Sequence, residues 1–109
     1  MRGKRREHIA KYLIKAAKRR AQEKGVPFDL DEHLVVITER TKSRRCELSG
    51  IPLKIAEGQR DYDSISIDRI VPEKGYTIDN VRIVCWAINA AAGTWGLEKA
   101  LEIMKKIKI

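Results

Sequence analysis

One stretch of the chain, residues 64–93, constrains the fold more than any other. It opens with a β-branched run, which Pro72 ends, as expected of a strand. Turn-forming residues follow, and the alternation of apolar residues over 81–85 predicts a second, half-buried strand. The next segment is rich in Ala and Ile, and Gly93 can end it as a short helix. The predicted order is therefore strand, loop, strand, helix.

Two polar residues of this stretch could form a site. Asp68 belongs to the first expected strand and Asn89 to the expected helix, so the two side chains could face one another. A carboxylate and an amide oxygen are ligands that suit a hard divalent cation. The alternatives are that Asp68 is a turn residue and that Asn89 simply faces water.

The same stretch resembles the HNH endonuclease motif, which belongs to the ββα-metal nuclease fold. The likeness is closest to small phage-type HNH proteins, and the order of the N-terminal segments extends it to most of the chain. The matching elements occur in the family's order: Ile67-Asp68-Arg69-Ile70, Pro72, Lys74-Gly75-Tyr76, Asn80-Val81, Val84-Cys85 and Asn89.

The resemblance implies an α+β fold, with a ββα-metal core, two N-terminal helices and one C-terminal helix. It also implies a metal-dependent DNA endonuclease or nickase that hydrolyses phosphodiester bonds. Asp68 and Asn89 would hold Mg²⁺ or Mn²⁺, and Asn80 would hydrogen-bond the backbone across the loop. With Arg69, these residues make up the expected catalytic set.

Arg69 is the main departure from the family pattern, because it stands where the family has its catalytic His. An arginine cannot be deprotonated in a protein, so Arg69 cannot be a general base. It could instead clamp a phosphate. His8 and His33 lie outside the motif, and they, metal-bound hydroxide or bulk water remain candidates for the base. The alternative function is a catalytically inactive HNH fold that binds DNA or a protein.

The two cysteines decide whether a structural zinc is expected in addition to the divalent cation. Many HNH proteins carry a structural zinc held by two Cys-x-x-Cys pairs. Here Ser49 and Ile88 stand where the partners of Cys46 and Cys85 would be. Neither Ser nor Ile replaces a thiolate ligand. No structural zinc is expected, and both cysteines are expected to act as small hydrophobic residues.

The chain carries a net charge of +8, which favours a polyanionic partner. Residues 1–45 form a basic helical region, with helices expected over 1–25 and 28–45. The first has an apolar stripe formed by Ile9, Tyr12, Leu13, Ala16, Ala17 and Ala21. The second opens with the pattern of a capping box, Asp29 and Glu32.

Double-stranded DNA is the expected partner, although a basic face can also be merely solvated. Helices that lie along a phosphate backbone contact it with Lys and Arg side chains. The residues expected to do so are Arg5, Arg6, Lys15, Lys18, Arg19, Arg20, Arg44, Arg45, Lys74 and Arg82.

The rest of the chain predicts a single domain over residues 1–109. An amphipathic helix is expected over 96–109, and Trp86 and Trp95 are expected to anchor the core rather than to stack on bases. No apolar run is long enough to span a membrane, and no secretory signal is present. The two cysteines, expected to be free thiols, favour a cytoplasmic protein, and a monomer is expected in preference to a dimer.

Overall fold

The computed structural model describes residues 2–56 and 58–109, and leaves aside the side chains of residues 2–7. The predicted contacts of Arg5 and Arg6 lie outside the described side chains. Within the described residues, four α-helices accompany one two-stranded antiparallel sheet, so the fold is α+β as predicted. The elements are α1 (Arg2–Lys24), α2 (Leu34–Arg40), β1 (Ile65–Arg69), β2 (Val81–Cys85), α3 (Trp86–Ala92) and α4 (Leu97–Met104).

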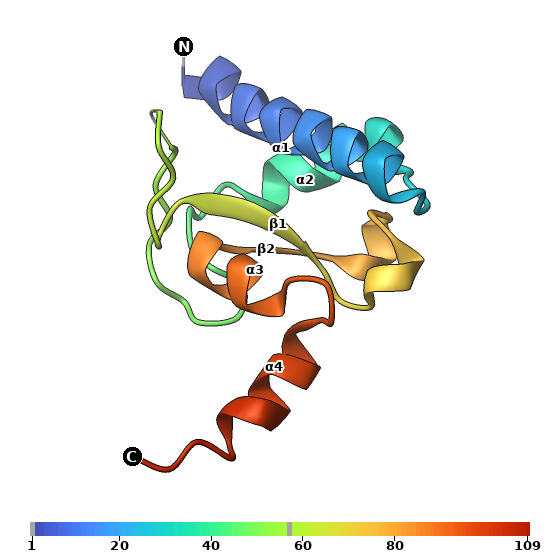
Figure 1. Cartoon of the computed structure of the whole chain (residues 1–109). Helices are drawn as coiled ribbons and strands as arrows, with labels where there is room; N and C mark the ends of the chain where they lie inside the picture. Colours follow the sequence, from blue (N-terminus) through green and yellow to red (C-terminus); the bar gives the residue numbers. More distant parts are fainter. Residues whose placement is uncertain (1, 57) are drawn as a thin grey trace.

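The sheet lies between the helices. β1 and β2 pair with Ile65 opposite Cys85 and Asp68 opposite Arg82. Helices α1 and α2 lie on one side of the sheet and α3 on the other (Figure 1). Gly93 ends α3 with a positive φ of 47° and donates its N–H to Asn89 O. The predicted order of strand, loop, strand and helix is confirmed.

The core lies between the sheet and α1. Every residue of β1 is buried, and Ile65 and Ile67 join the buried side of α1 in one apolar cluster. The predicted stripe of α1 is largely right, but Tyr12 is 47% exposed and Ile14 is buried instead. The cluster includes Ile9, Ala10, Leu13, Ile14, Ala17, Ala21, Leu30, Ile37, Cys46, Leu53, Ile65, Ile67, Tyr76, Val81, Ile83, Val84 and Cys85.

The second helix is shorter than predicted, and the expected capping box is wrong. A 3-10 turn, Leu30–His33, precedes α2, which ends at Arg40 rather than near residue 45. The Asp29 side chain makes no capping hydrogen bond. Its Oδ1 instead accepts the backbone N–H of Ile78, at 2.9 Å. This carboxylate therefore ties the start of the helical segment to the loop between the strands.

Asn80 fixes the loop between β1 and β2, as predicted. Its Nδ2 donates to Val71 O at 2.8 Å and to Gly75 O at 2.7 Å, and its Oδ1 accepts the N–H of Val71 at 3.0 Å. Gly75 has a φ of 74°, and a Cβ there would lie 2.2 Å from Pro27 O. Only glycine therefore lets this loop approach the end of α1 so closely.

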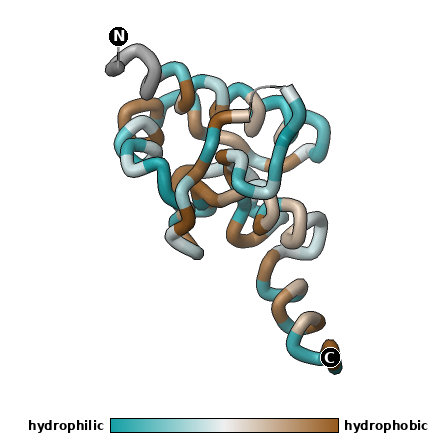
Figure 2. The backbone as a smooth tube through the Cα atoms, turned by 90° about the vertical axis from the view of Figure 1, so that its left-hand side faces the viewer, coloured by the Kyte–Doolittle hydropathy of each residue, from teal (hydrophilic) through white to brown (hydrophobic). Residues whose placement is uncertain are grey.

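Helix α4 departs most from expectation. It ends at Met104 instead of continuing to residue 109, and none of its residues is buried. It projects away from the rest of the chain (Figure 2). The prediction for Trp95 is wrong, since this residue is 79% exposed. Within the described residues, no helix is long and apolar enough to cross a membrane.

Both cysteines are buried and free, in keeping with their expected role as small hydrophobic residues. Burial raises the pKa of the Cys46 thiol, but hydrogen bonds from Ser49, Cys85 and Leu48 outweigh burial and lower the pKa overall. The N–H of Ser49 lies 3.4 Å from Cys46 Sγ.

Candidate functional site

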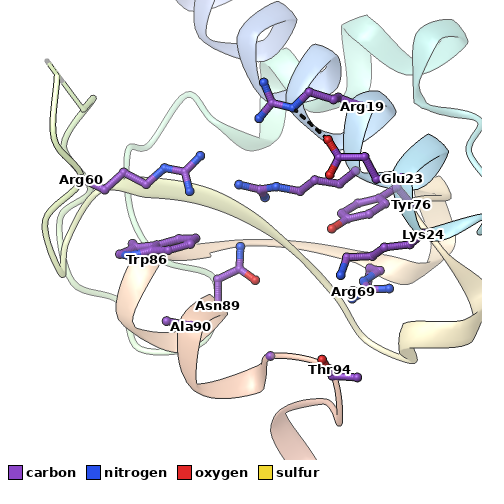
Figure 3. A pocket seen from close by; sticks show the side chains of 12 residues that line it. Arg19, Glu23, Lys24, Arg60, Arg69, Tyr76, Trp86, Asn89, Ala90 and Thr94 are labelled. Atoms are coloured by element: carbon purple, nitrogen blue, oxygen red, sulfur yellow. Dashed lines mark ion pairs between the residues drawn. The ribbon is translucent and has the colours of Figure 1, made fainter.

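A cleft of about 520 Å³ lies between α1 and α3. Helix α1 contributes four charged residues to one wall, and α3 forms the opposite wall (Figure 3). The residues that line the cleft are Arg19, Arg20, Glu23, Lys24, Arg60, Arg69, Tyr76, Trp86, Asn89, Ala90, Gly93 and Thr94. Among these described residues, five are cationic and one is acidic. The cleft is therefore strongly positive, and anions are the ligands that its field favours.

Arg69 is the most enclosed cation of the cleft. It is only 9% exposed, and its Nη1 donates to Pro72 O at 3.0 Å. Its guanidinium carbon lies 5.3 Å from the centroid of the Tyr76 ring. No ion pair joins Arg69 to any carboxylate of the described residues, although a buried charge without a partner is costly. This side chain is thus held in place, with its charge uncompensated.

Asn89 enters the cleft from α3. Its Nδ2 donates to Ser66 Oγ and, at 3.1 Å, to Ile67 O. These bonds hold the amide against β1 and fix which of its ends is the donor. Within the described part of the chain, Asn89 Oδ1 accepts no hydrogen bond, so this oxygen is free to accept one from a ligand.

Asp68 is placed differently from the sequence-based expectation. Its Oδ2 accepts a hydrogen bond from Arg82 Nη2 at 2.7 Å, and the carboxylate is only 4% exposed. It is not among the residues that line the cleft. A carboxylate that is neutralised by a guanidinium is a poor ligand for a cation. In this arrangement Asp68 and Asn89 do not fit together as the ligands of one divalent cation.

The same ion pair changes the assignment of Arg82. This residue is predicted to contact nucleic acid, but its guanidinium is turned toward Asp68 within the sheet. Its Nε is buried and, among the described residues, has no hydrogen-bond partner. Arg82 therefore compensates an internal charge, and we correct its assignment.

The remaining predicted contacts are dispersed over the surface. Arg19 and Arg20 line the cleft, whereas Lys15, Lys18, Arg44, Arg45 and Lys74 do not. Lys18 pairs with Asp31 at 2.8 Å, and Arg45 Nη1 donates to Gly50 O at 3.0 Å. Neither histidine lines the cleft; His8 borders a separate cavity, together with Arg44.

Eight of the residues that line the cleft were missing from the predicted site, and the cationic and aromatic ones among them are Lys24, Arg60, Tyr76 and Trp86. Lys24 continues the basic face of α1, and its spacing of four residues from Arg20 could have placed it there. Trp86 lies three residues before Asn89, which puts both on one face of α3. Arg60 and Tyr76 come from loops, and their positions depend on tertiary packing.

No protein-family model, curated protein or solved structure matches this chain, so the interpretation of the site rests on its own geometry.

Proposed function

We propose that this chain is an HNH-type protein that binds the phosphate backbone of DNA in the cleft between α1 and α3. Arg69 carries the proposal: it is a nearly buried cation that no described carboxylate compensates. A phosphate bound there would supply the missing charge and accept paired hydrogen bonds from the guanidinium.

Further support comes from the surroundings of Arg69. Arg20 and Lys24 come from the basic face of α1, and Arg60 comes from the loop that precedes β1. Phosphates along a nucleic-acid strand recur at short intervals, so several spaced cations can each contact one. The loop held by Asn80 also agrees with the role that the resemblance to HNH proteins assigns to this residue.

The test compares two variants with the same change in charge. Arg20→Gln with Lys24→Gln removes two cations from the cleft, and Lys105→Gln with Lys106→Gln removes two beyond the end of α4. Fluorescence anisotropy with a labelled DNA duplex measures the affinity of both variants for DNA. We expect the cleft variant to bind at least tenfold more weakly than the α4 variant. Equal losses of affinity in the two variants would mean that DNA binding depends only on net charge. This result would reject the cleft as the DNA-binding site.

Metal-dependent cleavage of DNA is the second candidate function. The observation that favours it is Asn89 Oδ1, an amide oxygen that faces the cleft without a partner among the described residues. The position of Asp68 opposes it, because the cation would need this carboxylate while Arg82 holds it. Among the described residues, no cluster of three or more His, Cys, Asp or Glu side chains could hold a metal.

Nicking of supercoiled plasmid, with Mg²⁺, Mn²⁺ or EDTA, separates the two candidates. If the protein is a nuclease, it nicks the plasmid only when metal is present. The Asp68→Asn and Asn89→Asp variants should then lose the activity or change their metal preference. If the protein retains DNA in a gel shift but does not nick it with either metal, the binding function stands alone. Lys105→Gln leaves the cleft intact and should nick like the unmodified chain, whereas nicking that persists unchanged in the Asp68→Asn and Asn89→Asp proteins would come from a contaminating nuclease.

A further inference from the structure

The end of the cleft opposite Arg69 carries an aromatic ring with a cation above it. Trp86 is the first residue of α3, and its half-buried ring forms part of the cleft wall. The guanidinium carbon of Arg60 lies 4.4 Å from the centroid of this ring. Figure 3 shows the stacked pair at one side of the cleft, with Arg69, Tyr76 and Lys24 at the other and Asn89 between them.

Backbone hydrogen bonds fix the start of α3, which carries Trp86. Trp86 donates its N–H to Ser64 O at 2.8 Å, and Ala87 donates to Tyr62 O at 3.0 Å. These bonds join the start of α3 to the segment that leads into β1. The residue that carries the ring is therefore anchored by its backbone to the wall of the cleft.

Arg60 is the exposed member of the pair. Its side chain is exposed, and within the described residues it makes no hydrogen bond or ion pair. Its guanidinium lies over the face of the Trp86 ring. A guanidinium in this position can move aside or remain as the second face of a stack. Ala90, Gly93 and Thr94 border the cleft nearby with small side chains, which leaves space for a flat group.

We propose that the Trp86–Arg60 pair binds an unpaired nucleobase of the DNA whose phosphate Arg69 holds; this inference rests on the proposed function. Nucleobases stack on Trp rings and on Arg guanidinium planes, and this stacking tolerates any base. Within a paired duplex both faces of each base are covered by its neighbours. Stacking on Trp86 therefore selects DNA with an unpaired nucleotide, such as a gap, a fork or a flipped base.

The position of Asn89 agrees with this substrate class. Its free Oδ1 lies between the phosphate end and the aromatic end of the cleft (Figure 3). An amide oxygen can accept a hydrogen bond from the exocyclic amine of an exposed base or from ordered water. A nucleotide with its phosphate on Arg69 and its base on Trp86 would bring the sugar past Asn89.

The test uses the two tryptophans as separate reporters. In Trp95→Phe protein, Trp86 is the only source of tryptophan fluorescence. In Trp86→Phe protein, the exposed Trp95 is the only source. Each is titrated with a DNA duplex and with the same duplex carrying a three-thymine single-stranded gap. We expect the gapped DNA to quench Trp86 strongly, to leave Trp95 nearly unchanged, and to bind more tightly than the intact duplex.

Affinity variants complete the experiment. Trp86→Ala should weaken binding to gapped DNA by about 5- to 150-fold, the range for loss of one stacked base, and change duplex binding little. Arg60→Gln keeps the Trp86 ring and should weaken binding to gapped DNA several-fold more than binding to the duplex, so the test does not depend on whether Trp86→Ala folds. Equal affinity for both DNAs with unquenched Trp86 would overturn the inference and leave the proposed function standing. Failure to bind either DNA would overturn both this inference and the proposed function.

Discussion

At the scale of single residues, two arginines on neighbouring positions of the sheet have opposite roles. Arg82 faces Asp68 directly across the two strands and compensates its charge. Arg69 is the next residue of β1 and therefore points to the other face, where it reaches the cleft without an acidic partner. One arginine thus stabilises the sheet, while the other keeps its charge available for a ligand.

The ion pair between Asp68 and Arg82 can be tested by its effect on stability. Asp68→Ala leaves Arg82 as a largely buried charge without a partner and should lower the free energy of unfolding by about 3 kcal/mol. Asp68→Leu combined with Arg82→Met replaces both charges with apolar groups and should recover most of this loss. Urea unfolding measures the free energy of unfolding of both variants. A loss below about 1 kcal/mol for Asp68→Ala would show that the pair is weak in solution and that Asp68 is available to a cation.

At the scale of elements, the turn after residue 45 is joined to both α2 and β2 by one side chain. Glu47 accepts two hydrogen bonds from Arg40, of α2, at 2.9 and 2.7 Å. Its Oε1 also accepts the N–H of Ile83, of β2, at 2.8 Å. Burial raises the pKa of Glu47, but the bonds from Arg40 and Ile83 outweigh burial and hold the pKa below its ordinary value of 4.5.

This lowered pKa makes the stability of the fold depend on pH. The bonds of Glu47 stabilise the folded chain fully above its ordinary pKa, and this contribution disappears as pH falls through the lower pKa of the folded state. Glu47→Gln should therefore be less stable at pH 7 and lose less stability between pH 5 and pH 3 than the unmodified chain. Urea unfolding across this range measures the effect, with Glu98→Gln in exposed α4 as control. Parallel pH profiles for Glu47→Gln and the unmodified chain would contradict the assignment.

Local sequence patterns predicted the elements well where the pattern and the packing agree. The alternation in 81–85, Gly93 and the β-branched run before Pro72 located β1, β2 and α3. The capping box failed because Asp29 Oδ1 instead accepts the N–H of Ile78, a residue 49 positions away. Helix α4 was predicted from an apolar pattern, which indicates a helix but does not say whether another element covers it.

At the scale of the whole molecule, the cleft exists only because distant segments pack together. Residues 19–24 of α1, Arg60, Arg69 and the face of α3 meet there, although the sequence separates the first from the last by about seventy positions. Charge and periodicity indicated that α1 carries a basic face. They did not indicate which of its cations lie opposite Trp86 and Asn89, because that depends on the rotation of α1 about its axis when its apolar stripe is buried.

The most direct measurement of the central claim is the salt dependence of DNA binding. Each phosphate contact releases counterions. Three cleft cations, Arg20, Lys24 and Arg69, are neither stacked on Trp86 nor paired with Glu23, so they predict a slope of about −2.7 for the logarithm of the association constant against that of the salt concentration. Binding should then weaken by about 40-fold between 50 and 200 mM salt, and by less in the Arg20→Gln, Lys24→Gln variant. Affinity that stays constant over this range, or an unchanged slope in that variant, would contradict phosphate binding in the cleft.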